Sequence, residues 1–267
     1  MKRLKQLSSG ILYRNPHPGL KAECAYLPNV VALSAQELLC FYRLGSAFYA
    51  ADGRIALLRS WDGGRSWRPE GLVWDATEDD RLYSYTAPHA TRLRNGILLL
   101  TVTRWECDDP TLPVFNAETG GLRDRQTILF RSEDNGRHWS APVVLDVPSA
   151  GGVIDTPSQI IELNNGRLFL ACEVWKQWAD SSSLHIRSFG LFSDDGGASW
   201  GERVDFPYAA EGEKMYSHGR YTQLQDGRIG VLLWTQGIGG QENFDLHLAF
   251  SDKNGTVWST PRQTGIQ

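Results

Sequence analysis

Three stretches of the chain repeat one pattern of apolar and polar positions. Each has a short alternating run, an Asn-Gly or Asp-Gly pair and a second, mainly apolar run, and they occupy residues 91–100, 161–170 and 222–231. A dipeptide of this kind supplies the backbone angles of a tight turn between two strands. The pattern therefore predicts three β-hairpins. Residues 31–40 form a degenerate first copy that lacks the glycine.

A second motif follows each hairpin. It reads Ser-x-[Asp/Lys]-[Gly/Asn]-Gly-x-x-Trp and occupies residues 60–67, 132–139, 193–200 and 251–258. The third position is Asp in three copies and Lys253 in the fourth, where Asp252 stands one place earlier. The acidic side chain can accept bonds from turn amides, glycine supplies positive φ, and tryptophan folds back over the hairpin. These residues are expected to build the fold.

The spacing of this motif sets the size of the repeating unit. The serines that open successive copies are 72, 61 and 58 residues apart. That spacing is too long for a solenoid repeat and suits a four-stranded blade with one variable loop. The sequence therefore predicts an all-β protein of the β-propeller class. We expect an N-terminal arm at residues 1–21 and blades at about 22–80, 81–150, 151–210 and 211–267.

The motif resembles the Asp-box, or bacterial-neuraminidase repeat, of the sialidase superfamily, and the resemblance covers residues 22–267. It implies a propeller of sialidase type, which has six blades in that family, whereas four blades are recognisable here. We therefore expect a C-terminally truncated chain, an oligomer whose partner chains complete the ring, or a closed four-bladed form. The blades that carry the family's nucleophilic tyrosine and last arginine are not among these four.

Composition narrows the classes of function. The 267 residues are 41% hydrophobic, and 27 Lys and Arg against 31 Asp and Glu give a net charge of −4 with no basic stripe, so nucleic acid is not an expected partner. Apolar runs are too short for a membrane span. The four cysteines are scattered without a Cys-x-x-Cys pair, and we expect neither a metal nor a cofactor. The N-terminus lacks the apolar core of a signal peptide, which predicts a cytoplasmic protein.

Candidate chemistry falls in two columns at one end of the propeller. Residues just before each inner strand converge there, and this first column contains Asn29, His89, Asp155, Gln159, His218 and Arg220. The loop after each second strand lies at the same end, and this second column contains Arg43, Arg104, Glu173 and Trp175. Arginine recognises carboxylates and tryptophan stacks on sugar rings. The two columns together predict a site for an acidic sugar.

The resemblance implies a glycoside hydrolase that acts on a terminal acidic sugar, like an exo-α-sialidase. In this interpretation Arg43, Arg104 and Arg220 bind the substrate carboxylate. Asp52, which stands where the family has its acid/base aspartate, or Asp155 protonates the leaving oxygen. Asp52-Gly53 is also an ordinary turn dipeptide.

Hydrolysis without the family's tyrosine would need two carboxylates, and Asp155 with Glu173 is the alternative pair. Two other functions remain open from the sequence. A non-catalytic carbohydrate-binding propeller would use the same Arg and Trp residues without an acid. A polysaccharide lyase would use His89 or His218 to abstract the proton next to a uronate carboxylate.

Overall fold

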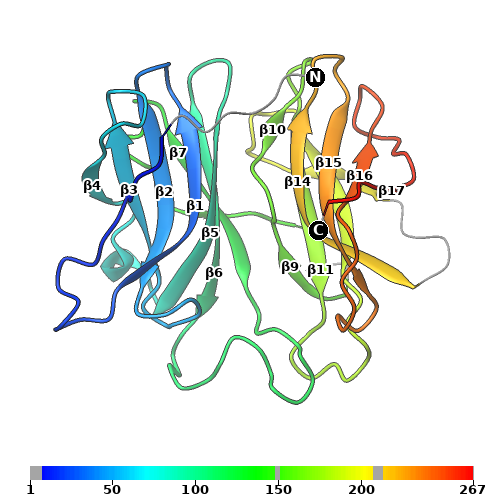
Figure 1. Ribbon diagram of the computed structural model, residues 1–267, viewed down its shortest axis with the longest axis horizontal. Coiled ribbons are helices and arrows are strands. Elements are labelled where there is room, and N and C mark those ends of the chain that lie inside the picture. The colour runs from blue at the N-terminus through cyan, green and yellow to red at the C-terminus, as the bar shows by residue number, and fades with distance from the viewer. Residues whose placement is uncertain (1–7, 148–150, 207–212, 267) are drawn as a thin grey trace.

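The computed structural model describes residues 8–147, 151–206 and 213–266. In these ranges four antiparallel sheets follow one another along the chain (Figure 1). The first sheet consists of β1 (Cys24–Ala32), β2 (Leu38–Gly45), β3 (Arg54–Ser60) and β4 (Arg68–Leu72). The second consists of β5 (Tyr83–Arg92), β6 (Leu98–Glu106), β7 (Gln126–Ser132) and β8 (Val143–Val144). The prediction of an all-β propeller is confirmed.

The third sheet has a divided inner strand. Both β9 (Val153–Asp155) and β10 (Ile161–Glu162) pair with β11 (Leu168–Trp175), which is followed by β12 (Arg187–Ser193) and β13 (Gly201–Asp205). The fourth sheet contains β14 (Lys214–Gln223), β15 (Ile229–Gly237), β16 (His247–Phe250) and β17 (Arg262–Gln263). A 3-10 turn, η1 (Ala76–Glu78), lies in the connection between the first two sheets. In the described ranges no helix is long and apolar enough to cross a membrane.

The Asp-box motif forms the turn between the third and fourth strands of each blade. In the second copy, the Ser132 hydroxyl donates to Asp134 at 2.9 Å and accepts from the Gly136 amide at 2.9 Å. The fourth copy keeps the turn although its aspartate has moved, because Asp252 accepts from the Thr256 amide at 2.8 Å. The motif therefore tolerates a one-place shift of its carboxylate.

The same turns also join neighbouring blades. Gly136 has φ +79°, and a Cβ added there would lie 2.8 Å from Leu39 of the first blade. Gly255 of the fourth blade, with φ +78°, has Phe192 of the third blade at 3.2 Å from the same added atom. Only glycine combines this conformation with so close an approach. The motif is thus part of the packing between blades, as expected for fold residues.

Apolar side chains fill the spaces between successive sheets. One core cluster joins the first and second blades around Phe41 and Phe130, and another joins the third and fourth around Phe169 and Tyr221. A third cluster, which includes Leu99 and Leu170, lies between the second and third blades. Because both faces of the second sheet are covered by neighbouring blades, every residue of β6 except Glu106 is buried, including its two threonines and Arg104.

The two ends of the blades differ. Hairpins and Asp-box turns lie at the upper end in Figure 1, and the long loops lie at the lower end. The longest, residues 107–125 between β6 and β7, crosses to the third blade, where Leu122 pairs with Gln177. The described part of the N-terminal arm places Tyr13 against Tyr42 of β2 at 5.6 Å between ring centroids. Residues 1–7 of the predicted arm lie outside the described residues.

Candidate functional site

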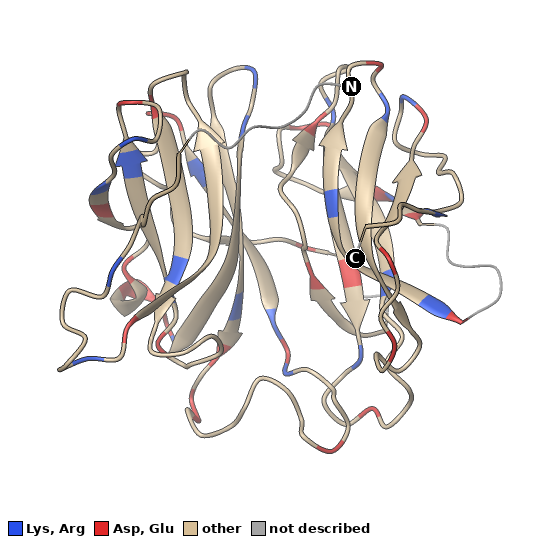
Figure 2. Ribbon diagram, in the orientation of Figure 1, with Lys and Arg blue, Asp and Glu red and all other residues tan. Residues whose placement is uncertain are grey.

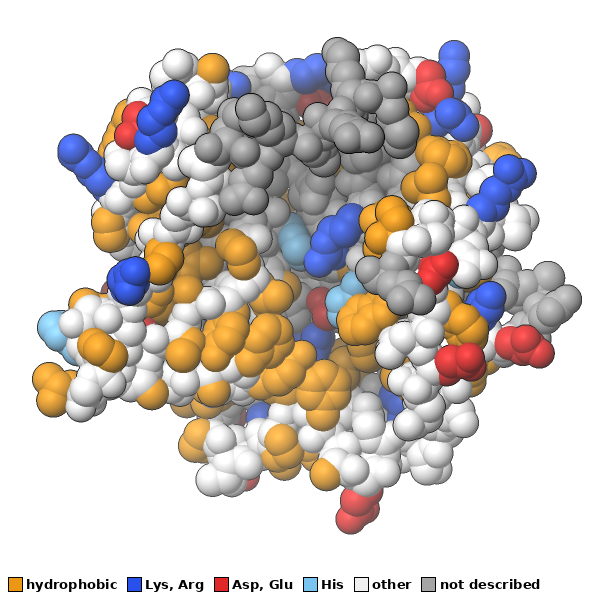
Figure 3. Space-filling view, viewed as in Figure 1, with side chains coloured by type: hydrophobic (Ala, Val, Ile, Leu, Met, Phe, Trp, Pro, Cys, Tyr) orange, Lys and Arg blue, Asp and Glu red, His pale blue; other side chains and the backbone are white. Residues whose placement is uncertain are grey.

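A cavity of about 370 Å³ lies where the inner strands of all four blades converge. Figure 3 shows a hollow at the centre of this face, in which histidine, arginine and acidic side chains gather between hydrophobic areas. The cavity is lined by Leu27, Pro28, Asn29, Phe48, Tyr49, Thr86, Ala87, His89, Arg125, Asp155, Thr156, Pro157, Gln159, Glu173, His218 and Arg220. The structure therefore brings together the whole first column predicted from the sequence.

Three of the four inner strands bulge at this level. The pairing register shifts between Tyr26 and Asn29 in β1, between Thr86 and His89 in β5, and between Ser217 and Arg220 in β14. Each bulge contains a non-glycine residue with φ near +50°, namely Leu27, Ala87 and His218. Such angles cost energy, and bulges redirect the side chains around them. The repeated bulge explains how Asn29, His89 and Arg220 come to line one cavity.

Two carboxylates of the third blade, Asp155 and Glu173, face this cavity. They are directly opposite each other in the register between β9 and β11. Glu173 is the one charged residue of β11, and charged residues are sparse on the strands of all four sheets (Figure 2). Asp155 accepts from the Thr103 hydroxyl at 3.0 Å and from the Thr156 amide at 2.9 Å, and it forms an ion pair with Arg125 at 2.9 Å. Three donors thus surround the Asp155 carboxyl group, and one of them is a guanidinium.

Glu173 has different surroundings. It is 1% exposed, and among the described residues it forms no ion pair. Its Oε1 accepts from the Gly219 amide at 3.4 Å, across the boundary to the fourth blade. Burial, with a smaller contribution from the charge of Asp155, raises the pKa of Glu173 to about 8. A carboxylic acid that keeps its proton at neutral pH beside a charged carboxylate is a pattern of acid catalysis.

Two arginines give the cavity positive charge. Arg125, at the end of the 107–125 loop, is 6% exposed in its side chain and contacts Asp155. Arg220 of β14 is exposed and donates to the carbonyls of Pro157 and, at 3.3 Å, His218. The sequence reasoning included Arg220 but missed Arg125, because in the loop after each second strand it selected residues near the end of that strand and not those directly before the third strand. The charged run 123–125 directly before β7 was the available signal.

The two histidines of the first column are uncharged at neutral pH. Burial, and then the charge of Arg220, lowers the pKa of His89 to about 4. The pKa of His218 is also lowered, again mainly by burial. The His218 ring packs against Trp175 at 5.7 Å and against Trp234 at 5.3 Å. Trp175, predicted as a sugar-binding residue, is therefore not part of the cavity lining and lies behind His218.

Gln159 also lines the cavity, and its amide donates to the Tyr221 carbonyl at 3.3 Å. The Asn29 side-chain oxygen accepts a hydrogen bond from the Ala90 amide of the second blade at 2.9 Å. Both side chains therefore connect neighbouring blades while they border the cavity.

Arg43 is not one of the residues that line the cavity. Its guanidinium is fully buried between the first two blades, where it donates to Ser84 at 3.1 Å and to the carbonyls of Tyr85, Ala47 and, at 2.7 Å, Ala50. The Arg43 guanidinium is therefore surrounded by protein atoms, and its burial lowers the pKa of Arg43. The geometry thus makes Arg43 a link between blades.

Asp52 lies in the loop between β2 and β3 and also stays outside the cavity lining. Both of its carboxylate oxygens accept from the Ser46 amide, at 3.0 and 3.1 Å. This arrangement corresponds to the turn role that Asp52-Gly53 commonly has.

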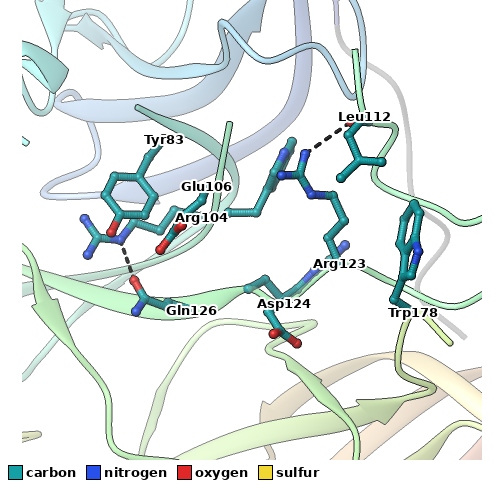
Figure 4. Close-up of a pocket in the computed structure, with 10 residues that line it drawn as sticks. Tyr83, Arg104, Glu106, Leu112, Arg123, Asp124, Gln126 and Trp178 are labelled. Atoms are coloured by element: carbon teal, nitrogen blue, oxygen red, sulfur yellow. Dashed lines mark hydrogen bonds between the residues drawn. The ribbon is translucent and has the colours of Figure 1, made fainter. Parts of the chain in front are cut away.

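Arg104 lines a different cavity, of about 390 Å³, below the second blade (Figure 4). Its Nε donates to Gln126 at 2.9 Å, and its guanidinium lies 3.9 Å from the centroid of the Tyr83 ring. The three arginines predicted to bind one carboxylate therefore do not converge. In the described ranges no three His, Cys, Asp or Glu side chains are placed to hold a metal ion.

Comparison with known proteins identifies the repeat. A family model described as a BNR repeat-like domain matches residues 36–213. No curated protein sequence matches this chain significantly. A crystal structure of a protein of unknown function from Dyadobacter fermentans DSM 18053 superposes with a TM-score of 0.75 at 18% identity, over 96% of this chain and 72% of that one.

Two enzymes have similar folds. The Hadza microbial sialidase Hz136 superposes with a TM-score of 0.68 at 15% identity, over 90% of this chain and 47% of the sialidase. An α-L-arabinanase from Penicillium chrysogenum, complexed with arabinobiose, superposes with a TM-score of 0.60 at 17% identity, over 87% of this chain and 64% of that one. The chain thus spans about half the length of the sialidase. At these identities the similarity establishes the fold, which is that of sialidase-type propellers.

Proposed function

This chain belongs to the BNR repeat-like domain family, with a propeller of sialidase type, and from that premise we propose that it is a glycoside hydrolase acting on an acidic sugar. The observation that carries the proposal is the pair Asp155 and Glu173. Two carboxyl groups that border one cavity, one ion-paired and one buried without a cation, are what hydrolysis of a glycosidic bond requires.

The roles follow from the surroundings of each group. Glu173, whose raised pKa of about 8 keeps it protonated, donates its proton to the glycosidic oxygen as the bond to the anomeric carbon breaks. Asp155 stabilises the positive charge that develops on the sugar ring. Water then supplies the hydroxyl group to the anomeric carbon, and its proton restores Glu173.

The charge of the cavity supports an acidic substrate. Arg125 is partly compensated by Asp155, whereas the described contacts of Arg220 are to carbonyl oxygens. A guanidinium in a cavity forms strong, directional hydrogen bonds with a carboxylate. Arg220 is therefore the residue that we expect to contact the acid group of the sugar.

One observation favours a second candidate, a polysaccharide lyase. His89 is uncharged, with a pKa of about 4, and the charge of Arg220 contributes to that value. An uncharged histidine close to an arginine can abstract a proton from the carbon next to a uronate carboxylate. The two reactions differ in their products, because a lyase leaves an unsaturated sugar that is lighter by one water molecule than the hydrolysis product.

Mass spectrometry of products from a panel of sialylated and uronate-bearing oligosaccharides tests the proposal. We expect release of an acidic saccharide of hydrolysed mass by the wild-type chain, and none by Glu173→Gln or Asp155→Asn. Glu162→Gln is the matched control, since Glu162 is on β10 of the same blade and pairs with Arg94 outside the cavity lining. An unsaturated product would favour the lyase, and a folded chain that releases nothing from any member would contradict both.

A further inference from the structure

The second cavity, which contains Arg104, has walls from the second and third blades. Its lining comes from the start of β5, the end of β6, the 107–125 loop with the start of β7, and Trp178 from the loop after β11. In Figure 4, Tyr83 and Arg104 lie on one side of the cavity, and Arg123 and Trp178 on the other. The cavity therefore lies between the second and third blades, and neither Asp155 nor Glu173 is part of its lining.

The wall that contains Trp178 is held in place by backbone contacts. The Trp178 carbonyl accepts from Asn116 at 2.9 Å and from the Thr119 hydroxyl at 2.7 Å. Gly121 approaches so closely that an added Cβ would lie 2.0 Å from the Gln177 carbonyl oxygen. These contacts fix the two loops to each other, so the cavity is formed before a ligand enters.

Within the described ranges, one arginine of the cavity lining has no ion-pair partner, although its charge contributes to lowering the pKa of Asp109 outside the lining. Arg104 interacts with Asp79 at 3.6 Å, and Glu106 pairs with Arg81 at 2.8 Å. Arg123 donates to the Leu112 carbonyl at 3.1 Å and forms no ion pair among the described residues. Figure 4 shows the Asp124 carboxylate turned to the opposite side from the Arg123 guanidinium. The cavity thus offers a positive group that its own lining does not neutralise.

The two cavities adjoin each other. Arg125 lines both of them, and its ion pair with Asp155 belongs to the central one. A ligand that occupied the central cavity could therefore continue past Arg125 into the second. Half-buried Trp178 offers an aromatic face for a sugar ring there, and Arg123 offers donors for a carboxylate.

We infer that the second cavity binds an acidic sugar residue of an oligosaccharide, with its carboxylate on Arg123 and its ring against Trp178. This inference rests on the proposed function, because it assigns the cleaved bond to the central cavity. It specifies the substrate further: the oligosaccharide carries an acidic residue beyond the one that is cleaved. Arg104, held by Tyr83 and Gln126, forms the fixed floor of this subsite.

Calorimetric titration of the full chain tests the inference, with Glu173→Gln as background so that no ligand is cleaved. The probes are acidic trisaccharides, both uronate and sialylated, together with the methyl esters that remove their carboxylate charge. We expect Arg123→Gln and Trp178→Leu each to weaken binding of an acidic trisaccharide about tenfold, the loss of one charged hydrogen bond or one stacking contact. Binding of the acidic monosaccharide stays unchanged.

Arg137→Gln, in an Asp-box turn away from both cavities, is the matched control. Three results would each overturn the inference. The first is equal affinity of Arg123→Gln and the control for the acidic trisaccharide, the second is equal affinity of the chain for the ester and the acid, and the third is no binding of any trisaccharide. The proposed function is tested separately by the mass of the products. Trisaccharide binding that depends on Arg123, without cleavage by the wild-type chain, would support the subsite and contradict the hydrolase.

Discussion

Asp155 and Glu173 are directly opposite each other across β9 and β11, yet their side chains have opposite electrostatic surroundings. Asp155 has Arg125 at 2.9 Å, whereas buried Glu173 accepts a long hydrogen bond from the Gly219 amide and has no cation as partner among the described residues. Burial raises the pKa of Glu173 to about 8, whereas Asp155 opposite it has a guanidinium as its partner. Four predictions follow from this difference and from the placement of the arginines around it.

Replacing Glu173 by Gln removes the transferable proton while keeping the shape of the side chain. We expect kcat to fall about 10²- to 10⁴-fold, the usual contribution of a general acid, with KM little changed. In the wild-type chain kcat/KM falls as the pH rises through about 8, where Glu173 loses its proton. Stopped assays across the pH range, on the substrate found by mass spectrometry, measure both effects. A basic limb that persists in the variant would contradict this role.

The raised pKa of Glu173 also makes stability depend on pH. The folded chain keeps this proton up to about pH 8, whereas the unfolded chain loses it near the ordinary value of 4.5. Stability contributed by this group is therefore fully present below pH 4.5 and is lost as the pH rises from 4.5 to 8. The amide that replaces the carboxyl group in Glu173→Gln does not titrate, so at pH 8 the unfolding free energy of this variant should exceed that of the wild type by a few kcal/mol. The conversion is on the order of 1.4 kcal/mol per pKa unit. Urea unfolding at pH 5 and pH 8 measures the difference, which should be much smaller at pH 5.

Arg43 and Arg220 should respond to substitution in opposite ways. Arg43→Met removes the guanidinium donor from the carbonyls of Tyr85 and Ala50, of which Ala50 keeps the Ser84 hydroxyl at 2.8 Å, and this predicts a loss of about 3 kcal/mol in unfolding free energy. Arg220→Gln changes an exposed side chain, so stability should stay within about 0.5 kcal/mol and KM should rise. Thermal unfolding and kinetics of both variants separate the two roles. A stable Arg43→Met variant with a raised KM would reverse the assignment.

Arg125→Gln removes the ion-pair partner of Asp155 and a shared wall of the two cavities. We expect kcat/KM to fall at least tenfold, and Arg125→Lys to retain part of the activity because it keeps the charge but loses the planar guanidinium. Arg131→Gln serves as a control, since Arg131 pairs with Glu133 at the opposite end of the blade. The measurement is steady-state kinetics, and equal rates for Arg125→Gln and the control would show that Asp155 needs no partner.

The fold could be predicted from the sequence because its signals are local. Each Asp-box turn is built from bonds within a few residues, such as Ser132 to Asp134 and to Gly136, so the residue types alone indicate the turn. The hairpins carry their own turn dipeptides as well. Local signals also placed Asp155, His89, His218 and Arg220 correctly in one cavity, because each stands at the same point before or within an inner strand.

The second column was predicted less well, because its residues alternate between two faces of a strand. Arg43, Thr103 and Glu173 occupy equivalent positions on the second strands of their blades. Each is paired with the inner-strand residue at which the regular pairing is interrupted, namely Tyr26, Thr86 and Asp155. Each of these side chains contacts the inner strand of the next blade. Arg104 is one residue further along β6 and so points to the other face. A one-residue error in register thus assigned Arg104 to the wrong cavity.

Arg125 was missed in the sequence analysis because its contact with Asp155 joins residues that are distant in the sequence. Arg125 and Asp155 are 30 positions apart, and the 107–125 loop determines where the guanidinium lies. No spacing in the sequence specifies that contact. The roles of the cavity residues in catalysis remain predictions, and they depend most on the protonation state of one buried acid.

The most direct test is therefore a titration of the glutamate side-chain carboxyl carbons by NMR, with Glu173→Gln to identify the signal. The account predicts one glutamate resonance in the wild-type chain that titrates near pH 8 and is absent from the variant. Glutamate resonances that all titrate between about pH 3 and 5, as ordinary glutamates do, would contradict it. In that case Glu173 would carry a charge at neutral pH and could not act as the proton donor.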